Sequence, residues 1–258
     1  MTHRYLPAIV TVTPTSLSAW ARCRRLFLLG HLLGVPASDP VPAPDRGNLV
    51  HAVLRFVHER GSCRDREHVE AALENNGIDD DLHRAMLERH AKRCPGGSDT
   101  DAHERDIARF HRFPAPMFMA SARIDAIWVH DGILDVRDYK TGRRWHDSLA
   151  EDPAAQVQAF VLAPHARRRG LSLRIRYEYL APEIDDDPES FDPDDDDLDA
   201  IDATIHGAVS AMWEEERWRG CGDAAICRTC RYRSICPDSA APGEPEWAAL
   251  AVAEEATG

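Results

Sequence analysis

The chain has 258 residues, which is enough for one large domain or two small ones with a substantial core. It contains no apolar run near the length of a transmembrane helix and begins without a signal-peptide pattern, so we expect a cytoplasmic protein with no membrane partner. The net charge of −13 argues against a uniformly basic surface. However, residues 183–202 carry twelve acids and no base, and arginine clusters elsewhere can still bind phosphates.

Helical patterns dominate the first part of the chain. Thr15 and Ser16 are candidate caps of a helix that runs to about Leu33. Four prolines at 36–46 indicate a linker, and further helices are predicted at 47–60, 65–75, 79–93 and 100–112. We therefore interpret residues 36–116 as a helical insertion or cap that precedes a core at 118–219.

A hairpin is predicted where Asp131-Gly132 separates two apolar, alternating segments. In this register Asp125 faces Asp138, and Lys140 lies on the same face of the sheet. Facing carboxylates repel each other, so a divalent cation such as Mg²⁺ or Mn²⁺ is one explanation for their placement. A solvated hairpin end with a salt bridge to Lys140 is the alternative.

The segment after the hairpin predicts a helix followed by a strand. Asp152 and Pro153 are suited to the N-cap and first turn, and Gln156 and Phe160 share one face. We expect Pro164 to kink or end this helix, although the basic run to Arg169 could extend it. A strand is predicted at 172–180, an acidic loop or helix lead-in at 183–202, and a long helix at 198–217.

Three cysteines near the end have spacing typical of a metal centre, namely Cys227, Cys230 and Cys236. Cys221 as a fourth ligand would complete a tetrahedral structural Zn²⁺ site, whereas Cys23 would indicate an iron–sulfur cluster. We expect the remaining cysteines, Cys63 and Cys94, to be partly buried thiols rather than ligands. Residues 220–237 thus form a cysteine segment, and residues 238–258 are predicted to be a loosely held tail.

Several short motifs occur in a recognisable order along the chain: Ser16-Leu-Ser-Ala-Trp-Ala-Arg-Cys-Arg-Arg25, Gly47-x-x-x-His51, Arg123-Ile-Asp125, Asp138-Tyr-Lys-Thr-Gly142, Gln156-x-x-x-Phe160 and the terminal Cys-x₂-Cys-x₅-Cys-Pro. With these motifs the chain resembles the RecB-type branch of the PD-(D/E)xK nucleases over nearly its whole length. The combination of Cys23 with the terminal triplet resembles the iron–sulfur subgroup, which includes AddB nuclease domains and CRISPR-adaptation exonucleases. Phe160 departs from the family pattern, which usually has tyrosine there.

The resemblance implies one RecB-like nuclease domain over 1–258, of α/β class, with a mixed sheet flanked by helices. It also implies a set of functional residues. The divalent metal, Mg²⁺ or Mn²⁺, would be held by His51, Asp125, Asp138 and the backbone carbonyl of Tyr139. Catalysis would involve Asp125, Asp138, Lys140 and Gln156, and a 4Fe–4S cluster would be bound by Cys23, Cys227, Cys230 and Cys236.

The function implied by the resemblance is metal-dependent hydrolysis of DNA phosphodiester bonds. We expect a single-strand exonuclease of DNA repair, recombination or CRISPR adaptation, which acts on single-stranded DNA or duplex ends. Arg143, Arg144 and the arginines at 167–176 would contact the DNA backbone electrostatically. A nuclease-like DNA-binding subunit that docks on a helicase or a CRISPR integrase and cleaves little is the alternative. A zinc-stabilised nuclease that acts on RNA is a further possibility.

Overall fold

The protein is described here by a computed structural model, which places residues 9–39, 45–59, 63, 65–94, 100–111, 116–142, 144, 146–183 and 187–241. The chain divides into two compact units. Unit 1 is formed from residues 1–43, 111–119 and 206–258, and unit 2 from residues 44–110 and 120–205. Among the helices within these described ranges, none has both the length and the apolar character needed to cross a membrane.

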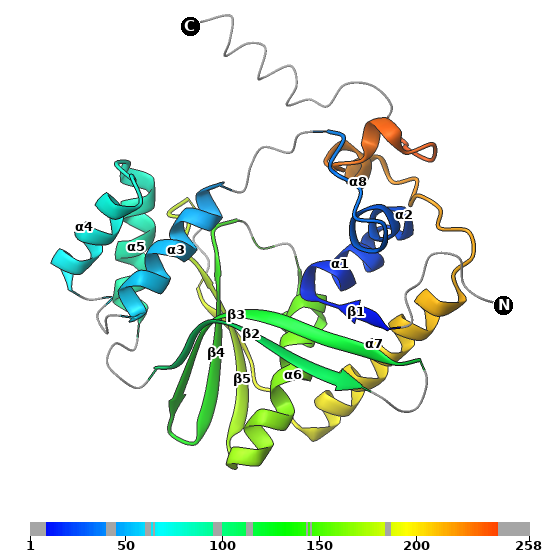
Figure 1. The fold of residues 1–258 in the computed structure, drawn as a ribbon. Helices are drawn as coiled ribbons and strands as arrows, with labels where there is room; N and C mark the ends of the chain where they lie inside the picture. Colours follow the sequence, from blue (N-terminus) through cyan, green and yellow to red (C-terminus); the bar gives the residue numbers. More distant parts are fainter. Residues whose placement is uncertain are drawn as a thin grey trace, which may run out of the picture. The chain divides into compact units, whose positions relative to one another are not determined.

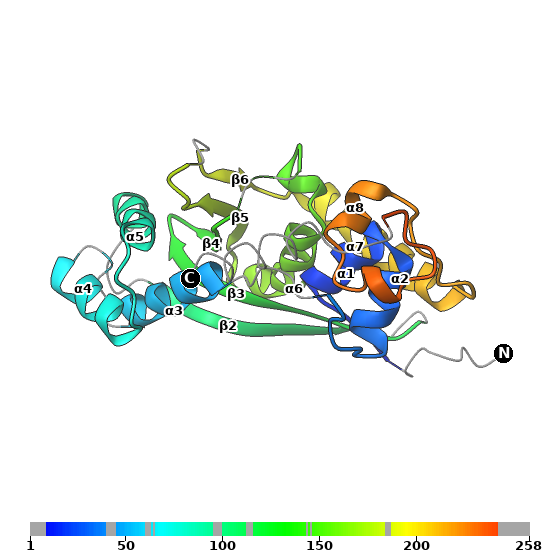
Figure 2. The ribbon, with the colours of Figure 1, turned by 90° about the horizontal axis from the view of Figure 1, so that it is seen from above.

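Unit 1 combines the two ends of the chain. Its N-terminal part contains β1 (Val10–Val12), α1 (Pro14–Arg22), α2 (Arg24–Phe27) and the π-helix η1 (Leu28–Leu32). Its C-terminal part contains the end of α7 (Asp195–Glu214), α8 (Ala224–Arg228) and the 3₁₀ helix η3 (Arg233–Ile235). Figure 2 shows α8 beside α1 and α2, so segments about 200 residues apart lie side by side.

The predicted single helix from Thr15 or Ser16 to Leu33 is wrong in two respects. The N-cap is Thr13, whose side chain and Ser16 form a reciprocal capping box. The chain then leaves the helical conformation at Cys23, which has extended dihedral angles of φ −164° and ψ 119°. This break separates α1 from α2 and leaves Cys23 between them.

Aromatic packing and hydrogen bonds join the two ends of the chain within unit 1. The Trp218 ring lies 6.0 Å from that of Trp20 and is stacked at 6.2 Å on that of Phe27. The Arg25 guanidinium donates to the Trp218 carbonyl at 2.6 Å and to the Asp238 carboxylate at 3.1 Å. These contacts stabilise the arrangement of the ends through protein groups alone.

Unit 2 contains the helices α3 (Asp45–Glu59), α4 (Arg66–Asn75) and α5 (Asp81–Arg93), which lie together in Figure 1. They confirm three of the predicted helices, and the side chains of Asp65 and Asp80 cap α4 and α5. The predicted helix at 100–112 is wrong, because this segment is the strand β2 (Thr100–His111), which pairs with β3. Pairing with a neighbouring strand here overrides the local helical pattern.

The described strands of unit 2, five in number, belong to a mixed sheet of six strands, as the predicted α/β class requires. The order is β3 (Phe118–His130), β4 (Ile133–Lys140), β5 (Ser172–Tyr179) and β6 (Glu189–Phe191), with β2 against β3. The predicted hairpin is confirmed, since Asp131 and Gly132 have φ of 49° and 74° and Ile127 pairs with Val136. The pairing of β4 with β5 is parallel, whereas the pairs β3–β4 and β5–β6 are antiparallel.

Helix α6 (Pro153–Arg169) connects β4 to β5 and packs against β5. Asp152 caps it as predicted, and a short 3₁₀ helix, η2 (Leu149–Glu151), precedes it. Pro164 does not end the helix, which continues to Arg169 and stops at Gly170 with a φ of 66°. Nearly the whole circumference of α6 is buried from Ala155 to Ala163, so packing offsets the helix bond that Pro164 lacks.

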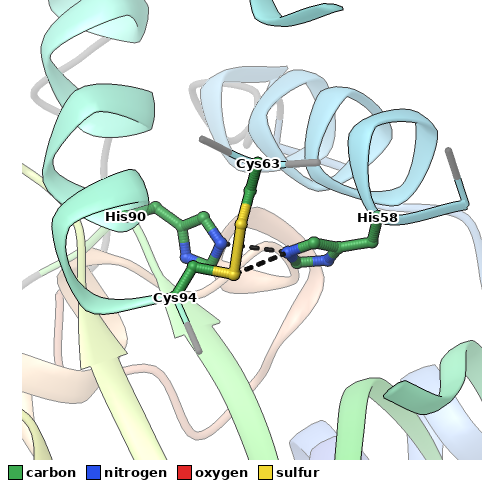
Figure 3. Close-up of side chains that lie close together, drawn as sticks. All are labelled: His58, Cys63, His90 and Cys94. Carbon is green, nitrogen blue, oxygen red and sulfur yellow. Dashed lines mark hydrogen bonds between the residues drawn. A yellow bond between two sulfur atoms is a disulfide. The ribbon is translucent and has the colours of Figure 1, made fainter. Parts of the chain in front are cut away.

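Cys63 and Cys94 are a correction to the sequence analysis, which predicted separate buried thiols. The structure pairs them as a disulfide between the segment that follows α3 and the end of α5 (Figure 3). Their separation of 31 residues gives no local signal of contact. They meet because α3 and α5 pack against each other.

Candidate active site in unit 2

The predicted metal ligands meet at the end of the β3–β4 hairpin. His51, on α3, approaches Asp125 of β3 with 3.0 Å between the histidine Nδ1 and one carboxylate oxygen. The second oxygen of Asp125 accepts the backbone N–H of Tyr139 at 2.8 Å. Gly47 helps α3 to approach, because a Cβ at this position would lie 3.2 Å from the Thr141 hydroxyl oxygen.

Asp138 is held by two donors. The ammonium of Lys140 lies 2.8 Å from Oδ1, and the amide nitrogen of Gln158 donates to Oδ2 at 2.8 Å. Lys140 also lies 4.1 Å from the centre of the Tyr177 ring. Asp138, Lys140, Asp125 and His51 are therefore gathered in one charged group.

The two glutamines of α6 have different partners. The Gln156 amide donates to the Ala150 carbonyl at 2.9 Å, so the structure does not bring this predicted catalytic residue against Asp138. Gln158, which sequence reasoning missed, makes that contact and is buried. Positions two apart face different directions on a helix, and the apolar pattern gave no signal of which polar face is turned to the sheet.

A second group of polar contacts, made by Asp152, supports the site. The Tyr177 hydroxyl donates to Asp152 at 2.6 Å, and the same carboxyl group accepts the Ala154 backbone N–H as the cap of α6. Asp152 therefore connects the start of α6 to β5, one strand from Asp138. This connection fixes the Tyr177 ring, which the Lys140 ammonium contacts.

The charges in the site perturb one another. Burial raises the pKa of Asp125, and the neighbouring charge of Asp138 raises it further. Burial by itself would lower the pKa of His51 and Lys140, but the adjacent carboxylates raise both pKa values above their usual range. The two acids thus favour the protonated, cationic forms of their neighbours His51 and Lys140.

The donor set fits a hard divalent cation. Two carboxylates, an imidazole and the nearby backbone of Tyr139 offer mostly oxygen ligands, which Mg²⁺ and Mn²⁺ prefer. The pKa of Asp125 is raised first by burial and then by the charge of Asp138, and a bound divalent ion would offset both effects. The Tyr139 ring lies among the imidazoles of His90, His58 and His51, with ring centres 4.9, 6.0 and 6.3 Å away, so Tyr139 faces the two acids with its backbone.

In unit 1, a separate pocket is lined by five free cysteines: Cys23, Cys221, Cys227, Cys230 and Cys236. Cys221, the alternative fourth ligand for zinc, lies next to Cys23. Partial burial raises the pKa of Cys221 to about 11, and the neighbouring Cys23 and Cys227 contribute. Crowded thiols of this kind are typical of a metal centre, where a cation would stabilise the thiolates.

The arginines predicted to contact DNA are engaged with acids in the structure. Arg174 donates twice to Asp192 at 2.6 Å, and Arg167 donates to Asp195 at 2.6 Å. Arg144 pairs with Glu189, and Arg143 lies outside the described residues. The acidic segment therefore leads into α7, as predicted, and partly neutralises this basic surface.

A protein-family model matches most of the chain. The family model "PD-(D/E)XK nuclease superfamily" matches residues 11–237. No curated protein matches the chain.

Two solved structures match this chain at low sequence identity. A protein from Eubacterium rectale, named a proposed exonuclease, has a TM-score of 0.50 at 12% identity, with 91% of this chain and 93% of that chain covered. The protein SSO0001 has a TM-score of 0.38 at 16% identity, with 75% and 85% covered.

Proposed function

Since the chain belongs to the PD-(D/E)XK nuclease superfamily, we propose that it is a metal-dependent deoxyribonuclease whose active site is the charged group in unit 2. The observation that carries the proposal is the convergence of Asp125, Asp138 and Lys140 at the end of one hairpin. Asp125, Asp138, His51 and the Tyr139 carbonyl would hold Mg²⁺ or Mn²⁺. A bound divalent ion would polarise the scissile phosphate and lower the pKa of a water molecule.

The residues of the chain itself have distinct roles in this proposal. Lys140 stays protonated at neutral pH because its pKa is raised, so it acts as a cation and donor toward the phosphate or the attacking water rather than as a base. Gln158 is a positioning residue, which fixes the orientation of Asp138. Gln156, expected to be catalytic, positions the start of α6 through Ala150.

We also propose that the cysteines of unit 1 hold a 4Fe–4S cluster, with Cys23, Cys227, Cys230 and Cys236 as ligands. These four cysteines line one pocket, to which Cys23 comes from the first part of the chain and the other three from its last part. Cys221 is available as an alternative fourth ligand for zinc.

The substrate and context complete the proposal. A single-strand exonuclease of DNA repair, recombination or CRISPR adaptation is the activity implied by the motif order, and the name of the Eubacterium rectale protein is in keeping with it. A helicase or integrase partner remains a prediction from the motifs alone.

The experiment is degradation of end-labelled single-stranded DNA by the purified protein with Mg²⁺ or Mn²⁺, with EDTA and with the variant Asp138→Asn. We expect degradation that EDTA and the substitution abolish. Binding of DNA without cleavage at any metal concentration would refute the enzyme and support the binding-subunit alternative.

A further inference from the structure

A second metal-ligating cluster lies in unit 2, away from the two acids of the active site. It consists of His58, Cys63, His90 and Cys94, all of them buried (Figure 3). One ligand atom from each residue lies within 4.8 Å of the other three. Neither the nuclease motifs nor the terminal cysteine segment includes any of these residues.

We propose that this cluster is a structural zinc site of the Cys₂His₂ type, occupied when its two cysteines are reduced. The Nε2 atoms of His58 and His90 are 3.0 Å apart, and Cys94 Sγ lies 3.7 Å from His58 Nε2. A tetrahedral zinc site has edges of about 3.3 Å between nitrogens and about 3.5 Å between sulfur and nitrogen, from bonds of 2.0–2.3 Å. The observed separations are close to these edges.

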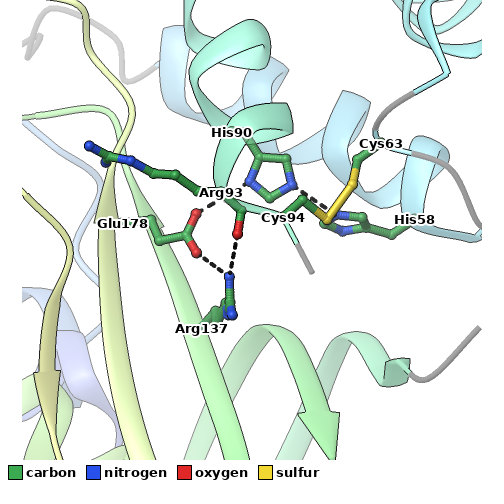
Figure 4. The surroundings of a disulfide bond; sticks show 7 residues. All are labelled: His58, Cys63, His90, Arg93, Cys94, Arg137 and Glu178. Atoms are coloured by element: carbon green, nitrogen blue, oxygen red, sulfur yellow. Dashed lines mark hydrogen bonds and ion pairs between the residues drawn. A yellow bond between two sulfur atoms is a disulfide. The ribbon is translucent and has the colours of Figure 1, made fainter. Parts of the chain in front are cut away.

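The surroundings of His90 match those of a zinc ligand. Its Nδ1 lies 3.4 Å from a carboxylate oxygen of Glu178, which leaves Nε2 directed toward the cluster (Figure 4). A carboxylate that accepts the distal N–H of a ligating histidine fixes both its tautomer and its orientation. Glu178 is itself held by the Arg137 guanidinium, which also donates to Asp135 at 2.9 Å.

Charge also favours this occupant. Zn²⁺ with two thiolates and two neutral imidazoles has no net charge, so it can be buried without the cost of an isolated ion. The nearby Glu178 is already paired with Arg137. Ligand chemistry of two sulfurs and two nitrogens suits zinc rather than the Mg²⁺ or Mn²⁺ of the active site.

The disulfide between Cys63 and Cys94 and the zinc site are mutually exclusive states of the same residues. A dithiol reductant transfers two electrons and two protons to the disulfide and becomes a disulfide itself. The two protein thiols then release their protons as Zn²⁺ binds. Either state connects the end of α3 to the end of α5.

The cluster is coupled to the active site through one helix and one ring. His51 and His58 are seven residues apart on α3, about 10 Å along its axis. The Tyr139 ring centre lies 4.9 Å from that of His90 and 6.3 Å from that of His51. Zinc at the cluster would therefore fix the helix that presents His51 to Asp125.

The test uses the full-length protein in dithiothreitol, with zinc content measured per chain and alkylation of each cysteine mapped by mass spectrometry. We expect zinc to protect Cys63 and Cys94 from iodoacetamide and a chelator to expose them. His90→Ala should lose one zinc per chain relative to wild type. His68→Ala, which removes a half-exposed histidine of α4, should lose none.

Alkylation of the wild type decides the question even if His90→Ala fails to fold. Equal labelling of Cys63 and Cys94 with and without zinc would overturn the proposal, as would a disulfide that persists in dithiothreitol. Neither readout depends on DNA cleavage, so the zinc site and the proposed nuclease activity can fail independently.

Discussion

The contact between Gln158 and Asp138 gives the sharpest test of how the active site is positioned. Gln158→Met keeps the length of the side chain but removes the amide that donates to Asp138 at 2.8 Å. A hydrogen bond to a charged group contributes about 1.5–3 kcal/mol, and each 1.36 kcal/mol corresponds to tenfold in rate. We therefore expect the rate of DNA degradation to fall about 10- to 150-fold.

The matched control is Gln156→Met, which changes the same residue type two positions earlier on α6. Its amide contacts the Ala150 carbonyl rather than the acids, so the rate should change by less than about threefold. The assay is single-turnover degradation of labelled single-stranded DNA at saturating Mn²⁺, together with Mn²⁺ affinity by calorimetry. Equal effects of the two substitutions, or a larger effect at Gln156, would refute the assignment of Gln158 as the positioning residue.

Three further predictions follow from other contacts. Lys140→Ala should lower the rate of DNA degradation about 10²- to 10³-fold, and Lys140→Arg should restore little of it. Lys92→Ala, which replaces the other lysine of the chain, should leave the rate unchanged in the same assay. Asp152→Ala removes the cap of α6 and the partner of the buried Tyr177 hydroxyl, so the free energy of unfolding, measured by thermal unfolding, should fall by about 2–4 kcal/mol. Asp80→Ala removes an exposed cap and should lower it by about 1 kcal/mol. Equal losses in the two variants would contradict this account. Burial alone would raise the pKa of Asp39, but hydrogen bonds from Ser234 and Ser38 lower it. The stabilisation from the ionised Asp39 is therefore present above the unfolded pKa of about 3.9 and is lost as the pH falls through the lower folded pKa. Asp39→Asn should flatten the decline of the melting temperature below about pH 4, and an unchanged decline would contradict the assignment.

The hairpin was predictable from sequence because its signals are local. Asp131 and Gly132 satisfy the positive φ of a tight turn, and the alternation of apolar residues fixes the register. Once the register is set, Asp125, Asp138 and Lys140 follow on one face. The N-cap of α6 was predictable for the same reason, since Asp152 and Pro153 act within one turn.

The predictions from sequence were wrong where contacts between distant segments decide the structure. Strand β2 forms through pairing with β3, which overrides its own helical pattern. The glutamine that reaches Asp138 depends on how α6 is rotated against the sheet, and both Gln156 and Gln158 are compatible with the sequence pattern. Cys63 and Cys94 meet through the packing of α3 on α5, for which their spacing gives no signal.

The most direct test of the central claim is anomalous scattering from crystals of the protein grown with Mn²⁺, measured at the manganese absorption edge. We predict a peak within bonding distance of carboxylate oxygens from both Asp125 and Asp138, and its loss in Asp138→Asn crystals grown in the same way. Manganese bound to only one of these acids, or bound elsewhere while both side chains keep the contacts described above, would contradict the proposal that they share one ion.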